Sequence, residues 1–172
     1  MDWWEIRTNW PVLEGASPSV IYGAISFSFR APLKSGAMAL AEKARPPRVL
    51  FADDNYGMHR LVHMVLGPAF EIVDAFNGQE MLDRIPSLDP DLLLVDINMP
   101  VLGGLEAVQR LSRDGRPAVL FLTAEVDAEL LSRMRSAGAQ GCVLKATADE
   151  YLLPAIHAAL KGENFFPPSV PD

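Results

Sequence analysis

Five side chains that could take part in a chemical reaction come directly after short apolar runs in this sequence. Asp53 and Asp54 come after "RVLFA", and Asp96 comes after "DLLLV". Thr123 follows "AVLFL", and Lys145 follows "GCVL". Carboxylates that are crowded together repel each other unless a cation joins them, and Mg²⁺ is a cation that prefers oxygen ligands. A carboxylate beside Mg²⁺ and an ammonium group is a competent nucleophile towards phosphorus, so the set predicts an aspartyl phosphate.

The apolar runs are predicted strands, and amphipathic stretches alternate with them from residue 48 onward. This alternation predicts an α/β fold with a parallel, doubly wound sheet of five strands and with five helices on its two faces. Four of the strands are nearly continuous apolar runs, which is typical of strands that are buried on both faces. The predicted strands are 48–52, 70–75, 91–95, 117–122 and 141–144, and the predicted helices lie near 56–66, 78–85, 104–113, 125–137 and 147–161.

The carboxyl ends of parallel strands meet at one edge of a sheet, where ligands bind in such folds. Each residue taken alone has a simpler interpretation: Asp54 as the cap of the helix near Tyr56, Thr123 as a cap of the next helix, and Lys145 as a solvated loop residue. Thr147 with Glu150 predicts a capping box at the last helix. Four of five strands nevertheless end in residue types that one reaction needs, which favours a shared site.

Composition excludes several classes of function. The formal charge of −7 and the pI of about 4.9 argue against direct DNA binding. Cys142 is the only cysteine, which fits a reducing cytoplasm. The sequence has no run of 18 apolar residues and no basic cluster at its start, so we expect neither a membrane span nor a secretory signal.

The chain divides near "KARPPR", at residues 43–48. Residues 1–45 follow no sustained period, and we expect them to be a disordered extension or not part of the native protein, with Met38 as a plausible start. Within this part "AISFSF", residues 24–29, alternates like a short strand, and three tryptophans offer the alternative of an aromatic docking arm. The expected organisation is an extension at 1–45, a domain at 46–165 and a tail at 166–172.

Four segments resemble the receiver domain of two-component response regulators: "FADDN", "DINMPVLGGLEAVQRL", "FLTAE" and "GCVLKATADEYLLPAI". They occur in the order of that family and cover about residues 47–165. The resemblance implies a flavodoxin-like sheet with strand order 2-1-3-4-5. The last segment is similar to receivers that precede a helix-turn-helix DNA-binding domain, and no such domain follows here.

The resemblance also implies a role for each residue at the sheet edge. Asp96 would be the phospho-acceptor, phosphorylated by a sensor histidine kinase or a phosphotransfer protein. Thr123 would be the switch hydroxyl, and Lys145 would pair with a phosphoryl oxygen. Mg²⁺ would lie directly on the carboxylates of Asp54 and Asp96 and would be linked to Asp53 directly or through water. The backbone carbonyl of Asn98 would complete the protein ligands.

Two positions depart from the family pattern. Cys142 stands where the family often has an aromatic ring that turns inward on phosphorylation, and a thiol cannot fill that volume. Ala146 stands where the family often has a proline after a cis bond, so we predict a trans peptide or a reshaped loop there. His59 and His63 lie four residues apart, a spacing that can bind metal, but with no third ligand evident they are predicted to be surface or partner-face histidines.

The leading hypothesis is therefore a phosphorelay switch rather than an enzyme, located in the cytoplasm, with output through protein contacts. One alternative is a receiver-like scaffold that is never phosphorylated. Another is a Mg²⁺-dependent phosphatase with an aspartyl phosphate, but such enzymes carry Asp-x-Asp on the first strand, whereas Asp53 and Asp54 are contiguous. The sequence names no kinase, stimulus or downstream target, and it leaves open whether a homodimer forms.

Overall fold

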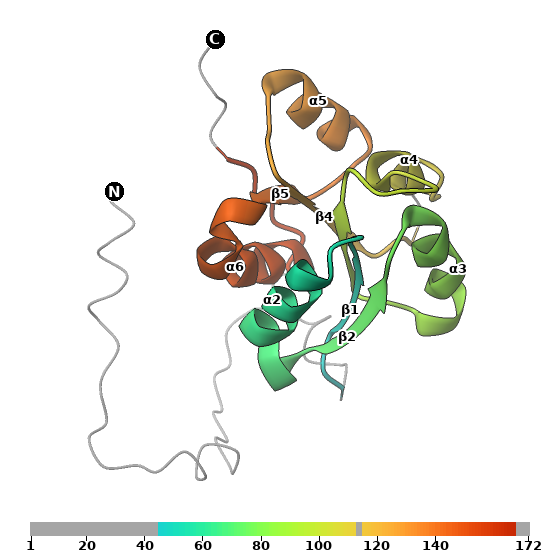
Figure 1. Ribbon diagram of the computed structural model, residues 1–172, viewed down its shortest axis with the longest axis vertical. Coiled ribbons are helices and arrows are strands. Elements are labelled where there is room, and N and C mark those ends of the chain that lie inside the picture. The colour runs from blue at the N-terminus through green and yellow to red at the C-terminus, as the bar shows by residue number, and fades with distance from the viewer. Residues whose placement is uncertain (1–44, 113–114, 168–172) are drawn as a thin grey trace, which may run out of the picture. The chain divides into compact units, whose positions relative to one another are not determined.

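The computed structural model describes residues 45–112 and 115–167. Its strands form one parallel sheet in the order β2-β1-β3-β4-β5 (Figure 1). The fold class and the strand order are confirmed. The strands are β1 (Arg48–Ala52), β2 (Glu71–Ala75), β3 (Leu92–Asp96), β4 (Ala118–Thr123) and β5 (Gly141–Leu144).

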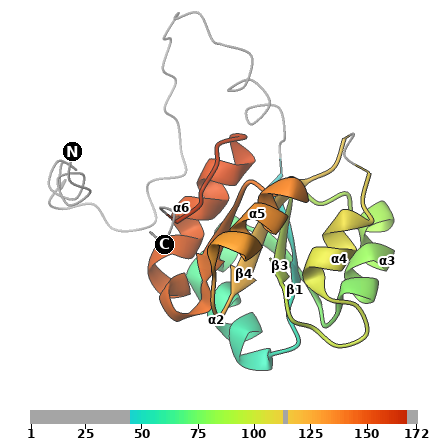
Figure 2. The same cartoon turned by 90° about the horizontal axis from the view of Figure 1, so that it is seen from above.

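Helices cover both faces of this sheet (Figure 2). α2 and α6 pack on one face, and α3, α4 and α5 pack on the other. The helices are α2 (Tyr56–Leu66), α3 (Gly78–Leu88), α4 (Gly104–Gln109), α5 (Ala128–Ser136) and α6 (Ala148–Leu160), with short 3-10 turns η2 (Gly67–Ala69) and η3 (Lys145–Thr147).

The core has two layers because successive strand side chains point to opposite faces. In β1, Leu50 and Ala52 join the layer under α3, α4 and α5, whereas Val49 and Phe51 join the layer under α2 and α6. All four are fully buried. The central strands thus have no solvent-facing side, as their continuous apolar runs predicted.

Element boundaries differ from the prediction where long-range pairing or a cap decides them. β3 and β4 each end one residue later than predicted, so Asp96 and Thr123 are the last residues of their strands; Asp96 pairs with Leu122 across the ladder. α5 begins at Ala128 rather than near 125, because the side chain of Asp127 accepts a hydrogen bond from Leu130 N and caps the helix there.

The predicted capping box at the last helix is wrong. Thr147 is the N-cap residue of α6, but its hydroxyl donates to the carbonyl of Leu144 instead of capping the helix. The 3-10 turn η3 runs directly into α6 and occupies the place of an extended N-cap.

The described residues contain no cis peptide bond, in agreement with the prediction for the bond before Ala146. No helix in the described ranges has the length and apolarity that a membrane crossing needs. The predicted strand at 24–29 and nearly all of the predicted extension at 1–45 lie outside the described residues.

Candidate functional site

Four strands deliver polar side chains to the same edge of the sheet. Asp53 follows β1, Asp96 ends β3, Thr123 ends β4, and Lys145 directly follows β5. The ammonium nitrogen of Lys145 lies 2.8 Å from Asp53 Oδ2 and 3.0 Å from Asp96 Oδ2. The structure thus joins the ends of the first, third and fifth strands through one cation.

The three carboxylates form a compact acidic pocket. One oxygen from each of Asp53, Asp54 and Asp96 lies within 4.8 Å of the others. Asp53 is fully buried and Asp96 nearly so, whereas Asp54 is exposed to solvent. Two buried acids and one exposed acid leave a side from which a hydrated cation can enter.

Asn55, not Asp54, caps helix α2. The Asn55 side chain accepts a hydrogen bond of 2.7 Å from Gly57 N, and its own backbone N–H donates to Asp53 Oδ1 at 2.8 Å. Asp54 is therefore not used as a helix cap, and the turn directs Asp53 into the sheet edge.

Burial and neighbouring charges raise the pKa values of two groups in this pocket, Asp96 and Lys145. Burial raises the pKa of the Asp96 carboxyl group above its usual value, even though Lys145 opposes this. Burial alone would lower the pKa of the Lys145 ammonium, but its hydrogen bonds to Asp53 and Asp96 outweigh burial, and the pKa is raised. The pocket holds more negative charge than one ammonium neutralises, and its ligands are all hard oxygens, so the residues present fit Mg²⁺.

Thr123 is buried, and its hydroxyl is already engaged. It donates a hydrogen bond of 2.8 Å to the backbone carbonyl of Glu125. A pocket of about 440 Å³ opens beside it, lined among others by Asn98, Thr123, Ala124 and Glu125. Asn98 also makes a backbone hydrogen bond to the Asp96 carboxyl group. The predicted role of the Asn98 carbonyl as a metal ligand stays a prediction.

The loop after Asp96 is held by glycine and a tight turn. Gly104 N donates to the carbonyl of Ile97, and a Cβ at Gly104 would lie 1.9 Å from the carbonyl oxygen of Asp96. Leu102 N donates to Pro100 O across Val101, whose φ is 70°. Only glycine permits the approach at position 104, which explains the glycine in the sequence motif.

The sequence analysis missed a polar cluster that supports the end of β1. His59 is 5% exposed, so its prediction as a surface residue is wrong. Its Nε2 lies 2.8 Å from the carbonyl oxygen of Asp53, and its Nδ1 lies 2.8 Å from Asp74 Oδ1. Asp74 comes from β2 and also lies 3.1 Å from His63, which is exposed as predicted. Asp74 is brought next to the two histidines only by the pairing of β1 with β2, which the sequence does not show.

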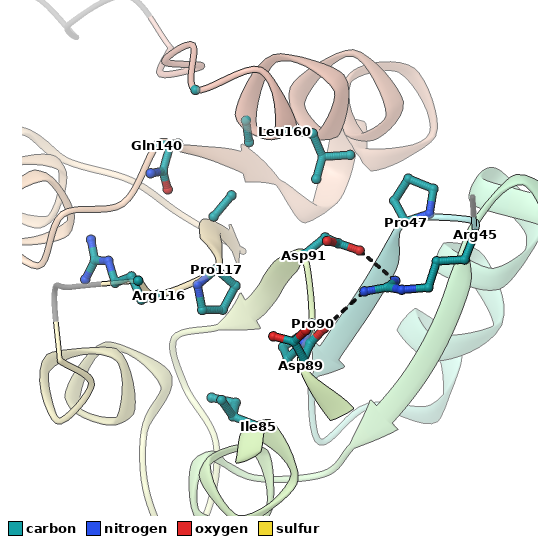
Figure 3. Close-up of a pocket in the computed structure, with 14 residues that line it drawn as sticks. Arg45, Pro47, Ile85, Asp89, Pro90, Asp91, Arg116, Pro117, Gln140 and Leu160 are labelled. Carbon is teal, nitrogen blue, oxygen red and sulfur yellow. Dashed lines mark hydrogen bonds and ion pairs between the residues drawn. The ribbon is translucent and has the colours of Figure 1, made fainter. Parts of the chain in front are cut away.

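A larger pocket, of about 540 Å³, lies away from this chemistry, beside the amino ends of the strands (Figure 3). Arg45 reaches across it and donates to Asp91 Oδ2 at 2.9 Å. Arg116, also in its wall, donates to the carbonyls of Ala137 and Gly138. Both arginines are thus engaged in structural contacts, so neither of them is a free cation for a ligand.

Comparison with known proteins identifies the family of the domain. A family model described as the response regulator receiver domain matches residues 49–157. The nitrate/nitrite response regulator NarP of Escherichia coli is 36% identical over 128 residues, which is 72% of this chain and 60% of NarP. The chemotaxis protein CheY of Halobacterium salinarum is 32% identical over 115 residues, which is 66% of this chain and 96% of CheY.

Solved structures show the same fold. The chemotaxis protein CheY4 of Vibrio cholerae superposes with a TM-score of 0.62 at 28% identity and covers 67% of this chain and 99% of its own. A LuxR-family response regulator from Aurantimonas gives 0.65 at 25% identity, with coverage of 70% and 89%. The chain spans 60% of the length of NarP and 56% of the length of NarL, a second nitrate/nitrite response regulator of Escherichia coli. What those whole proteins do therefore does not transfer directly.

Proposed function

Because the chain belongs to the response regulator receiver family of two-component signalling, we propose that it is a switch operated by phosphorylation of Asp96. The observation that supports this most directly is the Lys145 ammonium between Asp53 and Asp96, at 2.8 and 3.0 Å. This cation holds the acceptor carboxylate in the acidic pocket and is near enough to pair with a transferred phosphoryl group.

In the proposed reaction an oxygen of the Asp96 carboxylate forms a bond to phosphorus while the bond from phosphorus to the donor breaks. The donor is a phosphohistidine of a histidine kinase or of a phosphotransfer protein, and its imidazole leaves. Mg²⁺, held by Asp53, Asp54, Asp96 and the Asn98 carbonyl, would supply neutralisation of the phosphoryl charge. Lys145 then pairs with a phosphoryl oxygen.

The switch step follows from the position of Thr123. Its hydroxyl donates to the Glu125 carbonyl in this structure, so it must give up that hydrogen bond before it can donate to a phosphoryl oxygen. The segment from Thr123 to Asp127, which leads into α5, thereby has two arrangements that phosphorylation biases. Output is by protein contact, and polar Asn98 and acidic Glu125 beside the acceptor favour a short-lived phosphoform.

Labelling with a radioactive small phosphodonor tests the proposal. The wild-type chain should take up label when Mg²⁺ is present and should take up none when Mg²⁺ is chelated before the phosphodonor is added. Asp96→Asn should take up none in either condition. Asp83→Asn, an exposed acid on α3, is the matched control and should label like the wild type. Label in Asp96→Asn would show that Asp96 is not the acceptor, and a wild type that never labels would favour the unphosphorylated scaffold.

A further inference from the structure

The chain after α6 returns to the edge of the sheet. Residues Glu163–Pro167, called the strap below, follow Gly162, whose φ of 77° turns the chain. Phe165 N donates to the carbonyl of Gln140 at 2.8 Å, and Cys142 N donates to the carbonyl of Phe165 at 2.9 Å. These two bonds form a parallel bridge to β5, which is the edge strand of the sheet. The strap therefore takes the position of an added strand.

The two phenylalanines of the strap anchor it on both layers of the core. Phe165 packs against the layer under α2 and α6, and Phe166 packs against the layer under α3, α4 and α5. This alternation is that of a strand. The guanidinium carbon of Arg135, on α5, lies 4.1 Å from the centre of the Phe166 ring, within cation–π range. Adjacent aromatic residues thus serve as a two-sided anchor.

β5 has small residues where the strap crosses it. A Cβ at Gly141 would lie 2.1 Å from the carbonyl oxygen of Phe165, so a larger residue would exclude the strap. Cys142, which follows, is buried among the same layer that Phe166 covers. An aromatic residue from the strap therefore covers the layer to which the small Cys142 side chain contributes little volume.

The strap is held less firmly than the strands that it joins. It makes one backbone hydrogen bond with Cys142 of β5 and one with Gln140 just before β5, and both of its phenylalanines stay partly exposed. Lys145 directly follows Leu144, the last residue of β5, and Leu144 pairs with Thr123 of β4. Lys145 and Thr123 are thus direct neighbours of the strand that the strap joins.

We propose that the outer edge of β5 is a strand-addition site for an extended peptide with two adjacent aromatic residues. The chain's own strap occupies this site, and phosphorylation of Asp96 releases the strap so that a partner's segment replaces it. Backbone hydrogen bonds to an open strand edge supply the affinity in such sites, and the pockets for alternate side chains supply the selectivity. The release step rests on the proposed function, whereas the existence of the site does not.

Hydrogen exchange on the full chain tests the release. The amides of Phe165 and Cys142 report the two strap hydrogen bonds, and both should exchange about tenfold faster with Mg²⁺ and beryllofluoride than with Mg²⁺ alone. The amide of Leu94 in central β3 should not change. If the Thr123 amide responds to beryllofluoride and the strap amides do not, release is overturned and the proposed function stands. If Thr123 does not respond either, the proposed function fails, and release fails with it.

A peptide test examines the site without phosphorylation. The probe is a fluorescent peptide with the sequence Glu-Asn-Phe-Phe-Pro, and its control has alanine at both aromatic positions. The full chain with Phe165→Ala and Phe166→Ala should bind the probe about tenfold more tightly than the wild type, because its own strap no longer competes. His157→Ala, an exposed ring elsewhere, is the control variant and should bind like the wild type.

Failure of the folded double variant, verified by circular dichroism, to bind the probe would overturn the strand-addition site. Equal binding of the alanine control peptide would overturn the role of the aromatic residues. A further Gly141→Val change in the double variant should abolish binding of the probe, because its Cβ would stand where the added backbone lies. Binding that survives this change would place the peptide elsewhere and refute the proposal.

Discussion

Replacement of Lys145 by methionine probes the electrostatic arrangement on which the site depends. The ammonium bridges two buried carboxylates at 2.8 and 3.0 Å, and its side chain is 20% exposed. Removal of one partner from a buried ion pair costs about 3–5 kcal/mol, since the remaining charge is left uncompensated. Because Lys145 is partly exposed, we expect the lower end, a loss of about 3 kcal/mol in the free energy of unfolding without Mg²⁺.

The loss should depend on both Mg²⁺ and pH. Mg²⁺ at a hundred times its dissociation constant adds about 2.7 kcal/mol to the stability of a folded state that alone binds it. The variant should gain more than the wild type at equal Mg²⁺, because its pocket is more negative. Burial raises the folded pKa of Asp96, so the carboxyl group is neutralised early as pH falls, and the difference between the proteins should shrink towards acid.

Urea unfolding at about pH 7.5, with and without Mg²⁺, measures these differences. Lys161→Met is the matched control because Lys161 is exposed at the end of α6, and it should change stability by no more than about 0.5 kcal/mol. A loss below about 1 kcal/mol for Lys145→Met without Mg²⁺ would show that the two carboxylates do not depend on this cation, and the reasoning would be refuted.

Three further changes have definite expected outcomes. Gly104→Ala should lower the free energy of unfolding by about 2 kcal/mol or more and impair phosphorylation of Asp96, because its Cβ would lie 1.9 Å from a carbonyl oxygen; urea unfolding and labelling measure the two effects. Burial raises the pKa of Cys142 to about 11, so iodoacetamide should alkylate the native thiol at about pH 8 roughly a hundredfold more slowly than the unfolded one, as mass spectrometry can follow. Since the unfolded thiol ionises first, the free energy of unfolding should also fall as pH rises from about 9 to 11. Asn77→Ala should cost about 1 kcal/mol, measured by thermal unfolding, since the Asn77 side chain accepts the hydrogen bond from Glu80 N that caps α3.

Contradicting outcomes for two of these predictions, and one further pH prediction, are equally specific. Gly103→Ala leaves its Cβ 3.2 Å from the nearest atom, so it should be tolerated far better than Gly104→Ala; equal losses would contradict the steric argument. Alkylation of native Cys142 at the unfolded rate would contradict its burial. Glu80 accepts a hydrogen bond from Phe76 N that lowers its pKa, so its stabilisation is present above the unfolded pKa and is lost as pH falls. A glutamine at position 80 should remove that acid dependence.

The local sequence pattern was sufficient to predict the helices, the strands and the polar residues at the edge of the sheet. Period and composition over a few residues predicted five strands and five helices, and the strands ended where Asp53, Asp96, Thr123 and Lys145 were expected to meet. This worked because buried parallel strands have a strong apolar signal and because their carboxyl ends must share an edge. Boundaries moved by one to a few residues where a cap such as Asp127, or pairing with a neighbouring strand, had the final effect.

What the sequence by itself determined is therefore the order of the elements and the residue types placed at their ends. Only the tertiary structure decided that His59 is buried between Asp53 and Asp74, that the Thr123 hydroxyl is bound to a backbone carbonyl, and that Phe165 joins the edge of β5. The physical reason is the distance along the sequence between the residues that interact. Periodicity and caps are properties of neighbouring residues, whereas each of these contacts depends on strand pairing or a side-chain conformation that only the packed molecule selects.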